Sequence, residues 1–173
     1  MIVNIMNFAY IVAIGIGVIS CATDVQSRRI PNVLTFGAAI AGVIFHATWG
    51  NGALFSVEGW AVAAAAFVIP FALGGLGAGD VKLLGALGTW LGPGQAIWLA
   101  LYTGVAGGVL SVVVATYYGY LGQALSNVRL LLTHWRVCGV GPVHEISLEG
   151  SAGPRLAYAL PIFAGLVLTI WLR

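Results

Sequence analysis

Two aspartates are the strongest candidates for chemistry in this sequence, because each lies at one end of a long apolar segment. Asp24 ends the first apolar segment, and Asp80 begins a later one behind four glycines in the six positions 74–79. An ionisable side chain at membrane depth is costly, so it usually faces a partner, a cavity or a substrate path. Two carboxylates held close together can share one proton, and the pair then offers a general base and a general acid. That combination is the chemistry of acid–base hydrolysis of a peptide bond.

The glycines before Asp80 support a site rather than a plain connection. Glycine has no Cβ and tolerates positive φ, so another backbone can approach Asp80 closely. A simpler interpretation makes Asp80 the N-cap of the helix that follows. Capping alone explains neither so many glycines nor a second aspartate in a matching position, so we prefer the paired site.

Composition identifies the chain as an integral membrane protein. Its 173 residues are 60% hydrophobic and only 7% charged, and mean hydropathy is +1.01; soluble domains carry about 25% charged residues. The length allows about six spans of ~20 residues with short connections, so we expect one polytopic membrane domain over residues 1–173. A net charge of +2 without a basic run gives no reason to expect nucleic-acid binding. The two cysteines, Cys21 and Cys138, are too isolated for a zinc site or a disulfide framework.

We therefore predict an all-α fold of about six transmembrane helices. The expected spans cover about 4–22, 33–49, 59–73, 80–91, 95–120 and 156–172. The fourth is short: twelve residues rise only ~18 Å, against ~30 Å for the hydrocarbon core. Either the glycine connection partly enters the membrane, or Asp80 sits in a water-filled recess. Apolar residues from Leu121 to Trp135 recur at helical spacing, which predicts an amphipathic helix on the cytoplasmic membrane surface.

Cations predict how the spans are oriented. Six of the seven fall in or beside the first, third and fifth connections, and Arg173 is the exception; the six are Arg28, Arg29, Lys82, Arg129, Arg136 and Arg155. The positive-inside rule assigns these connections to the cytoplasm. Both termini then face outward, and both aspartates lie at the cytoplasmic face.

The motifs around the aspartates resemble those of a known family. The run Gly77-Ala78-Gly79-Asp80, followed by Val81-Lys82-Leu83, is similar to the GxGD signature of membrane aspartyl proteases. Asp24 with Arg28-Arg29-Ile30-Pro31-Asn32 resembles the other aspartate region of type IV prepilin peptidases. The resemblance covers essentially the whole chain in span number, span order and placement of both aspartates.

This resemblance implies a peptidase of the bacterial inner membrane that acts on prepilins and pseudopilins. Such enzymes remove a short basic leader on the cytoplasmic side, after a glycine and before a hydrophobic helix. Many bacterial members also carry an insertion with paired CxxC motifs and methylate the new N-terminus. This chain looks more like the compact, peptidase-only branch that serves Flp/Tad-type pili. We therefore expect neither methyl transfer, nor a cofactor, nor a metal.

The resemblance also suggests roles for individual residues. Asp24 and Asp80 take the catalytic roles, and Gly77 and Gly79 let an extended substrate reach Asp80. Lys82 either pairs with a carboxylate or raises the local positive potential, or it simply extends to the membrane interface.

Arg28 and Arg29 are topology determinants first, and a role in receiving an acidic group of the mature pilin is the alternative. His46 is expected to be a buried or interfacial histidine rather than a ligand.

Other classes of protein remain as alternatives. A small transporter or channel subunit also carries acidic residues and broken helices in the membrane, but at midplane rather than at span ends. A subunit of an assembly machine could retain the aspartates without activity. A presenilin-like protease would place both aspartates within adjacent spans, which the neighbouring arginines beside Asp24 do not favour.

Overall fold

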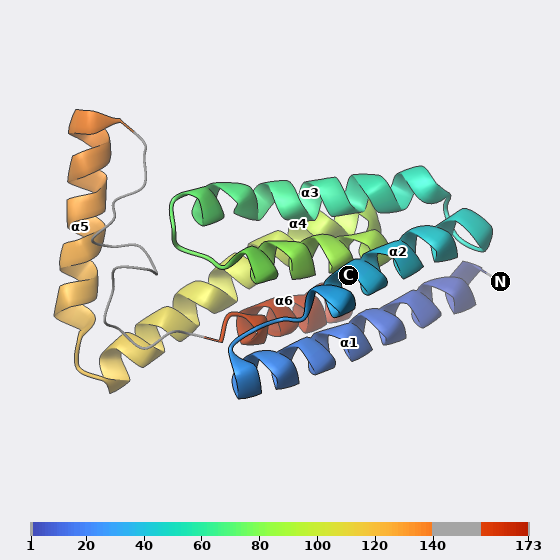
Figure 1. Ribbon diagram of the computed structural model, residues 1–173, viewed down its shortest axis with the longest axis horizontal. Helices are drawn as coiled ribbons and strands as arrows, with labels where there is room; N and C mark the ends of the chain where they lie inside the picture. The colour runs from blue at the N-terminus through green and yellow to red at the C-terminus, as the bar shows by residue number, and fades with distance from the viewer. Residues whose placement is uncertain (1, 140–156, 173) are drawn as a thin grey trace.

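The computed structural model describes residues 2–139 and 157–172. These residues form helices and no strand, which confirms the predicted all-α class (Figure 1). The helices are α1 (Ile2–Ser27), α2 (Asn32–Thr48), α3 (Ala53–Ala72), α4 (Ala78–Tyr117), α5 (Leu121–Cys138) and α6 (Ala159–Trp171). Of the cations used to predict orientation, Arg155 and Arg173 lie outside the described residues.

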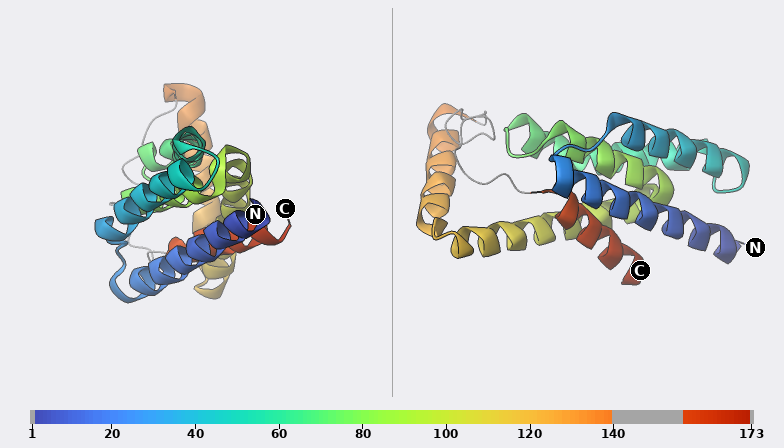
Figure 2. Two further views of the ribbon diagram at one scale, coloured as in Figure 1. Left: turned by 90° about the vertical axis from the view of Figure 1, so that its right-hand side faces the viewer. Right: turned by 60° about the horizontal axis from the view of Figure 1, so that its bottom comes forward.

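Helix α4 reverses its direction at Gly92. Gly92 has φ 77° and ψ 173°, a conformation that L side chains rarely adopt, and Pro93 follows without a backbone N–H to donate. The ring of Phe55 in α3 packs so closely on Gly92 that a Cβ there would collide with it. Residues on both sides of the reversal then contact α3, so the segments 78–91 and 93–117 run in opposite directions (Figures 1 and 2). The break expected at residues 92–94 is this reversal.

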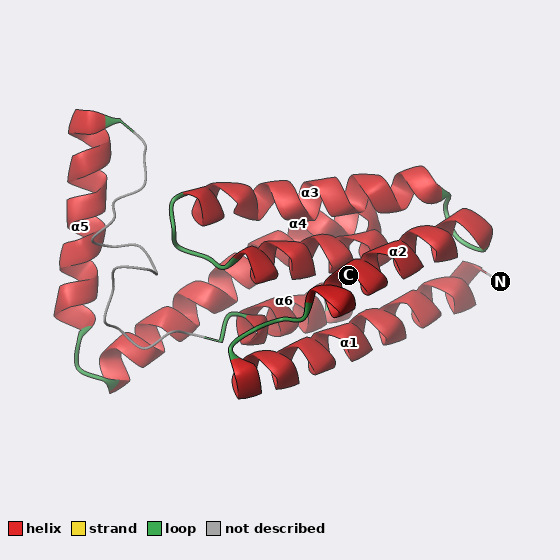
Figure 3. Cartoon of the chain, in the orientation of Figure 1, coloured by secondary structure: helices red, strands yellow, loops and turns green. Residues whose placement is uncertain are grey.

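The resulting bundle places the sites of interest at one end. Direction alternates from each segment of the bundle to the next, in the order α1, α2, α3, the two segments of α4, and α6 (Figure 2). The end of α1, the start of α4 and the start of α6 therefore lie at one end of the bundle, and both chain termini lie toward the other. Figure 3 shows the loops that join α1 to α2, α2 to α3 and α3 to α4.

The expected number of membrane spans needs correction. Three described helices are long and apolar enough to cross a membrane: Met6–Ser27, Ala53–Ala72 and Ala78–Tyr117. That is fewer than the six expected. Two of the expected spans, 80–91 and 95–120, are joined within α4. Helices α2 and α6 are apolar but shorter, with 17 and 13 residues. Thirteen residues rise only ~20 Å, less than the hydrocarbon core.

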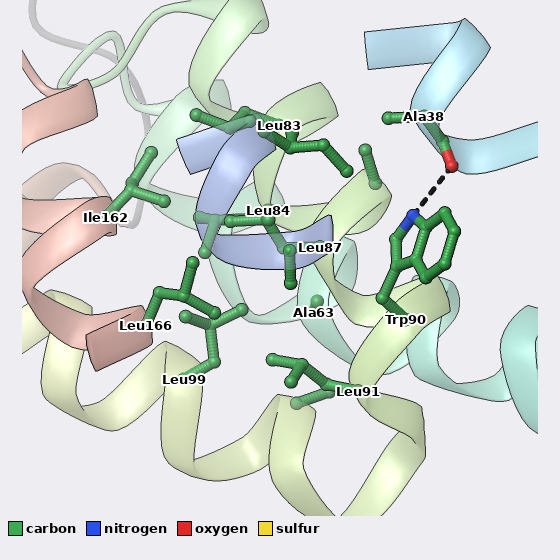
Figure 4. Packing of buried hydrophobic residues seen from close by; sticks show 14 of the residues in the cluster. Ala38, Ala63, Leu83, Leu84, Leu87, Trp90, Leu91, Leu99, Ile162 and Leu166 are labelled. Carbon is green, nitrogen blue, oxygen red and sulfur yellow. Dashed lines mark hydrogen bonds between the residues drawn. The ribbon is translucent and has the colours of Figure 1, made fainter. Parts of the chain in front are cut away.

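The first segment of α4 is the centre of the bundle. Every residue from 83 to 92 is buried. Leu83, Leu84 and Leu87 pack against Leu99 of the second segment and against Ile162 and Leu166 of α6 (Figure 4). Burial of one leucine side chain contributes ~1.5–3 kcal/mol in water, and within a membrane close packing takes over that role. Asp80 lies one turn before this block, so the best-packed part of the fold holds it in place.

Two polar side chains fasten α4 to α2. The indole Nε1 of Trp90 donates a hydrogen bond to the carbonyl of Ala38, at 2.9 Å (Figure 4). His46 is only 3% exposed, its Nε2 lies 3.2 Å from the carbonyl oxygen of Trp90, and its Nδ1 accepts from Asn51 N. These partners require the neutral tautomer with the proton on Nε2. The prediction of a buried histidine is confirmed.

Helix α5 stands apart from the bundle and runs across its long axis (Figure 1). The predicted helix from Leu121 to Trp135 is therefore present and extends to Cys138. Its apolar residues Leu125, Val128 and Leu132 are all exposed.

Candidate active site

Asp24 is buried near the end of α1 and is held by the start of α6. Its side chain is 7% exposed, and Oδ2 accepts a hydrogen bond of 3.1 Å from the backbone N of Ala159. Ala159 is the first residue of α6, so the carboxylate occupies a helix N-terminus, where unpaired N–H groups attract negative charge. Helix α1 makes a second contact with the start of α6, because the Cys21 thiol donates a hydrogen bond to the carbonyl oxygen of Ala159 at 3.1 Å.

Asp80 occupies the third position of α4 rather than the N-cap. Gly77 is the N-cap, and its backbone N donates to Asp80 Oδ2 at 3.1 Å, which closes one half of a capping box. The capping interpretation is thus correct in part, with Gly77 and not Asp80 at the cap. A Cβ on Gly77 would lie 3.1 Å from Asp80 Oδ2, whereas a Cβ on Gly79 would make ordinary contacts with Ile30. Gly77, more than Gly79, is required for the local geometry.

The structure brings the two aspartates to one end of the bundle from different helices. They are close enough for their charges to interact. The start of α6 contacts Asp24 through the backbone of Ala159, and the preceding residue, Tyr158, lies close enough to Asp80 for the charge of that carboxylate to act on its hydroxyl. Two carboxylates and a phenol thus lie at the same end of the bundle.

The predicted cations Arg28, Arg29 and Lys82 lie at the same end of the bundle as the two carboxylates. Arg28 has φ 53° and donates its backbone N–H to the Asp24 carbonyl at 2.8 Å, so it ends α1 in a left-handed conformation. Arg29 follows and is exposed. The Lys82 ammonium donates to Asn32 Oδ1 at 3.0 Å and lies 5.4 Å from the centre of the Phe36 ring. Lys82 is therefore directed at α2.

A largely apolar cavity of about 640 Å³ adjoins the site. Val62, Ala66 and Phe67 of α3 line one side, and Ala100 and Gly104 of α4 line another. The glycine connection reaches it through residues 75 and 76, and Tyr158 is the one residue of the lining with a polar side chain.

Sequence reasoning gave the start of α6 no role in the site. Tyr158 and Ala159 lie at the beginning of the expected span 156–172, and no motif there marks a functional residue. The contact between Ala159 and Asp24 joins residues 135 positions apart, and no local motif marks it. The one available signal was Pro161, since proline favours the first turn of a helix and so indicates a helix N-terminus nearby.

No group of three His, Cys, Asp or Glu side chains in the described ranges is placed to hold a metal ion.

The fold and this pair of carboxylates define the class: a helical membrane protein with an acidic site at one end of its bundle. Comparison with family models narrows the class, because the type IV leader peptidase family matches residues 11–112, a range that includes Asp24 and Asp80. The match covers more than half of the chain, so the chain belongs to the type IV leader peptidase family. It is therefore a peptidase of the prepilin type, as its motifs predicted. Comparison with curated proteins finds no match, and neither does comparison with solved structures.

Proposed function

We propose that this protein is a GxGD-type aspartyl endopeptidase that removes the short basic leader of Flp/Tad-type prepilins and pseudopilins. The cut follows a glycine, at the cytoplasmic face of the inner membrane. One observation carries the proposal: Asp24 near the end of α1 and Asp80 at the start of α4 lie at the same end of the bundle, where the start of α6 binds Asp24. The family supplies the substrate class, and the two carboxylates supply the chemistry.

In the proposed reaction the aspartate pair starts with one shared proton. The ionised carboxylate takes a proton from a water molecule, and the oxygen of that water attacks the carbonyl carbon of the scissile bond. The protonated carboxyl group gives its proton to the carbonyl oxygen, which forms a tetrahedral diol. When the diol collapses, one carboxyl group gives its proton to the leaving nitrogen, the other carboxylate takes a proton from a diol hydroxyl, and the C–N bond breaks. The pair holds one proton before and after the reaction, and we assign neither step to a particular aspartate.

The proposed orientation rests on the alternating bundle and on the cations. We place α1, α2, α3, both segments of α4, and α6 in the bilayer, with the aspartate end toward the cytoplasm. Arg28, Arg29 and Lys82 lie at that end, as the positive-inside rule requires. The direction of α5, across the bundle axis, supports its placement on the cytoplasmic membrane surface.

The short helices support a recess for the aspartates. The segment 78–91 and α6 are too short to cross ~30 Å of hydrocarbon, so their starts lie below the membrane surface. Asp80 and Ala159 are at these starts, and we propose that the site lies in a sheltered, water-filled depression. Arg29, exposed at the rim, is the cation we assign to an acidic group of the mature pilin, and Gly77 admits the extended substrate.

The test is cleavage of an Flp-type prepilin by the purified protein in detergent. Sequencing the mature N-terminus should place the cut after glycine, and S-adenosylmethionine should add no methyl group to it. A bulky residue in place of that glycine should block processing. Absence of cleavage, with ion or solute flux in proteoliposomes, would instead favour a transporter. Absence of both would favour a non-catalytic assembly subunit.

A further inference from the structure

The start of α6 places Tyr158 next to a contact with Asp24. The backbone N of Ala159 donates to Asp24 Oδ2 at 3.1 Å, and Tyr158, just before it, lies close enough to Asp80 for that charge to act on its hydroxyl. The dipeptide therefore fixes the position of the phenol relative to Asp24. Because the Ala159 contact is made by the backbone, changes to the Tyr158 side chain leave it in place.

The hydroxyl of Tyr158 is positioned by the second segment of α4. It lies over Gly107, which is buried, and a Cβ on Gly107 would collide with the hydroxyl and approach Cζ to 2.9 Å. No hydrogen bond joins this hydroxyl to another residue of the described ranges 2–139 and 157–172. A half-buried hydroxyl with no hydrogen bond to these described residues keeps donor capacity for a ligand.

The Tyr158 hydroxyl acts as a hydrogen-bond donor. The pKa of a tyrosine hydroxyl is ordinarily about 10, so Tyr158 keeps its proton near neutral pH. Its ring lines the apolar cavity together with Gly75 and Leu76 of the glycine connection that leads to Asp80.

We infer that Tyr158 is a third catalytic residue, whose hydroxyl donates a hydrogen bond to the carbonyl oxygen of the cleaved peptide bond. The inference rests on the peptidase function proposed above. A fixed donor beside an oxygen that gains negative charge stabilises the transition state more than the bound substrate, so it raises kcat rather than tightening binding.

The direct test is Tyr158→Phe, assayed for kcat and KM on the same prepilin. Phenylalanine keeps the ring on Gly107 and removes only the hydroxyl. We expect kcat per folded enzyme to fall about 10- to 100-fold, with KM changed by less than about twofold. Tyr102→Phe is the matched control, because the Tyr102 ring packs on Trp98 instead, with centroids 5.7 Å apart; it should keep the wild-type kcat.

A second pair of variants moves the hydroxyl without removing it. Gly107→Ala should displace the Tyr158 hydroxyl and lower kcat, while Gly108→Ala, with no atom within 4 Å of the new Cβ, should not. A wild-type kcat in folded Tyr158→Phe would overturn the inference, while the proposed aspartyl peptidase function would remain supported. A loss confined to KM would also overturn it. Failure of the wild-type enzyme to cleave any prepilin would overturn the proposed function, and this inference with it.

Discussion

Replacing Gly88 by alanine tests how the packing of α3 on α4 holds the site. Gly88 faces Gly59, and the backbones of the two helices approach closely there. A Cβ on Gly88 would lie 2.8 Å from Ala63 Cβ and 2.8 Å from the carbonyl carbon of Gly59. Ordinary contacts begin at 3.4 Å, so the helices must separate by at least about 0.6 Å. Backbone atoms form most of this contact, and no flexible side chain can move aside.

The magnitude follows from two opposing effects. Overpacking a close contact costs ~1–3 kcal/mol, and an obstacle made of backbone favours the upper end of that range. Alanine offsets up to ~1 kcal/mol of this cost, because its helix propensity is higher than that of glycine. The net loss is then ~2 kcal/mol in the free energy of unfolding, or roughly 30-fold in the ratio of folded to unfolded protein.

The same displacement reaches the chemistry, since Asp80 lies two turns before Gly88 on the same segment of α4. Misplacement of a catalytic group by ~1 Å can cost ~100-fold in rate, so we expect at least a tenfold loss of cleavage per folded enzyme. Denaturant unfolding in detergent, with prepilin cleavage on the same preparations, measures both effects. Gly108→Ala is the control and should be neutral or slightly stabilising. If Gly88→Ala equals Gly108→Ala in stability and activity, the close α3–α4 contact is not what positions Asp80.

Further predictions concern the end of α1, the start of α6 and the need for metal. Asp24→Ala should unfold more readily than Asp24→Asn by ~1–3 kcal/mol, because alanine leaves the buried Ala159 N–H without the acceptor that asparagine retains; equal unfolding midpoints would contradict this. Arg28→Val should unfold more readily than Arg28→Gly by ~1–2 kcal/mol in the same assay, because glycine tolerates the φ of 53° at this position and valine does not; equal stability of the two variants would argue against the left-handed helix end. Prepilin cleavage should survive metal chelators, since the carboxylates act on water directly; loss of cleavage that a divalent ion restores would mean that they bind metal.

Local sequence patterns were sufficient for the helices and for the placement of the aspartates. Apolar runs and their breaks indicated each described helix, although the expected span 59–73 begins six residues after the start of α3 at Ala53. Gly92 and Pro93 marked the reversal in α4, because glycine and proline act on the backbone wherever they stand. Counting alternating segments then placed Asp24 and Asp80 at the same end.

Contacts between distant residues could not be read in the same way. Lys82 meets Asn32 across 50 positions, and Asp24 meets Ala159 across 135. Such pairs are set by how the helices pack, and periodicity within one helix carries no information about its neighbours. The span count failed for a related reason: composition recognises apolar segments, but the length of a helix after packing decides whether it can cross a bilayer alone.

The central claim is that Asp24 and Asp80 act as one acid–base unit, and a double-mutant cycle tests it most directly. Asp24→Asn, Asp80→Asn and the double variant should all bind prepilin and remain folded, because asparagine keeps the size and the acceptor oxygen. Each single variant should lose cleavage by at least about a thousandfold, and the double variant should be scarcely worse, since groups that act together are strongly non-additive. Substantial turnover by either folded single variant, or losses that multiply in the double variant, would contradict the account.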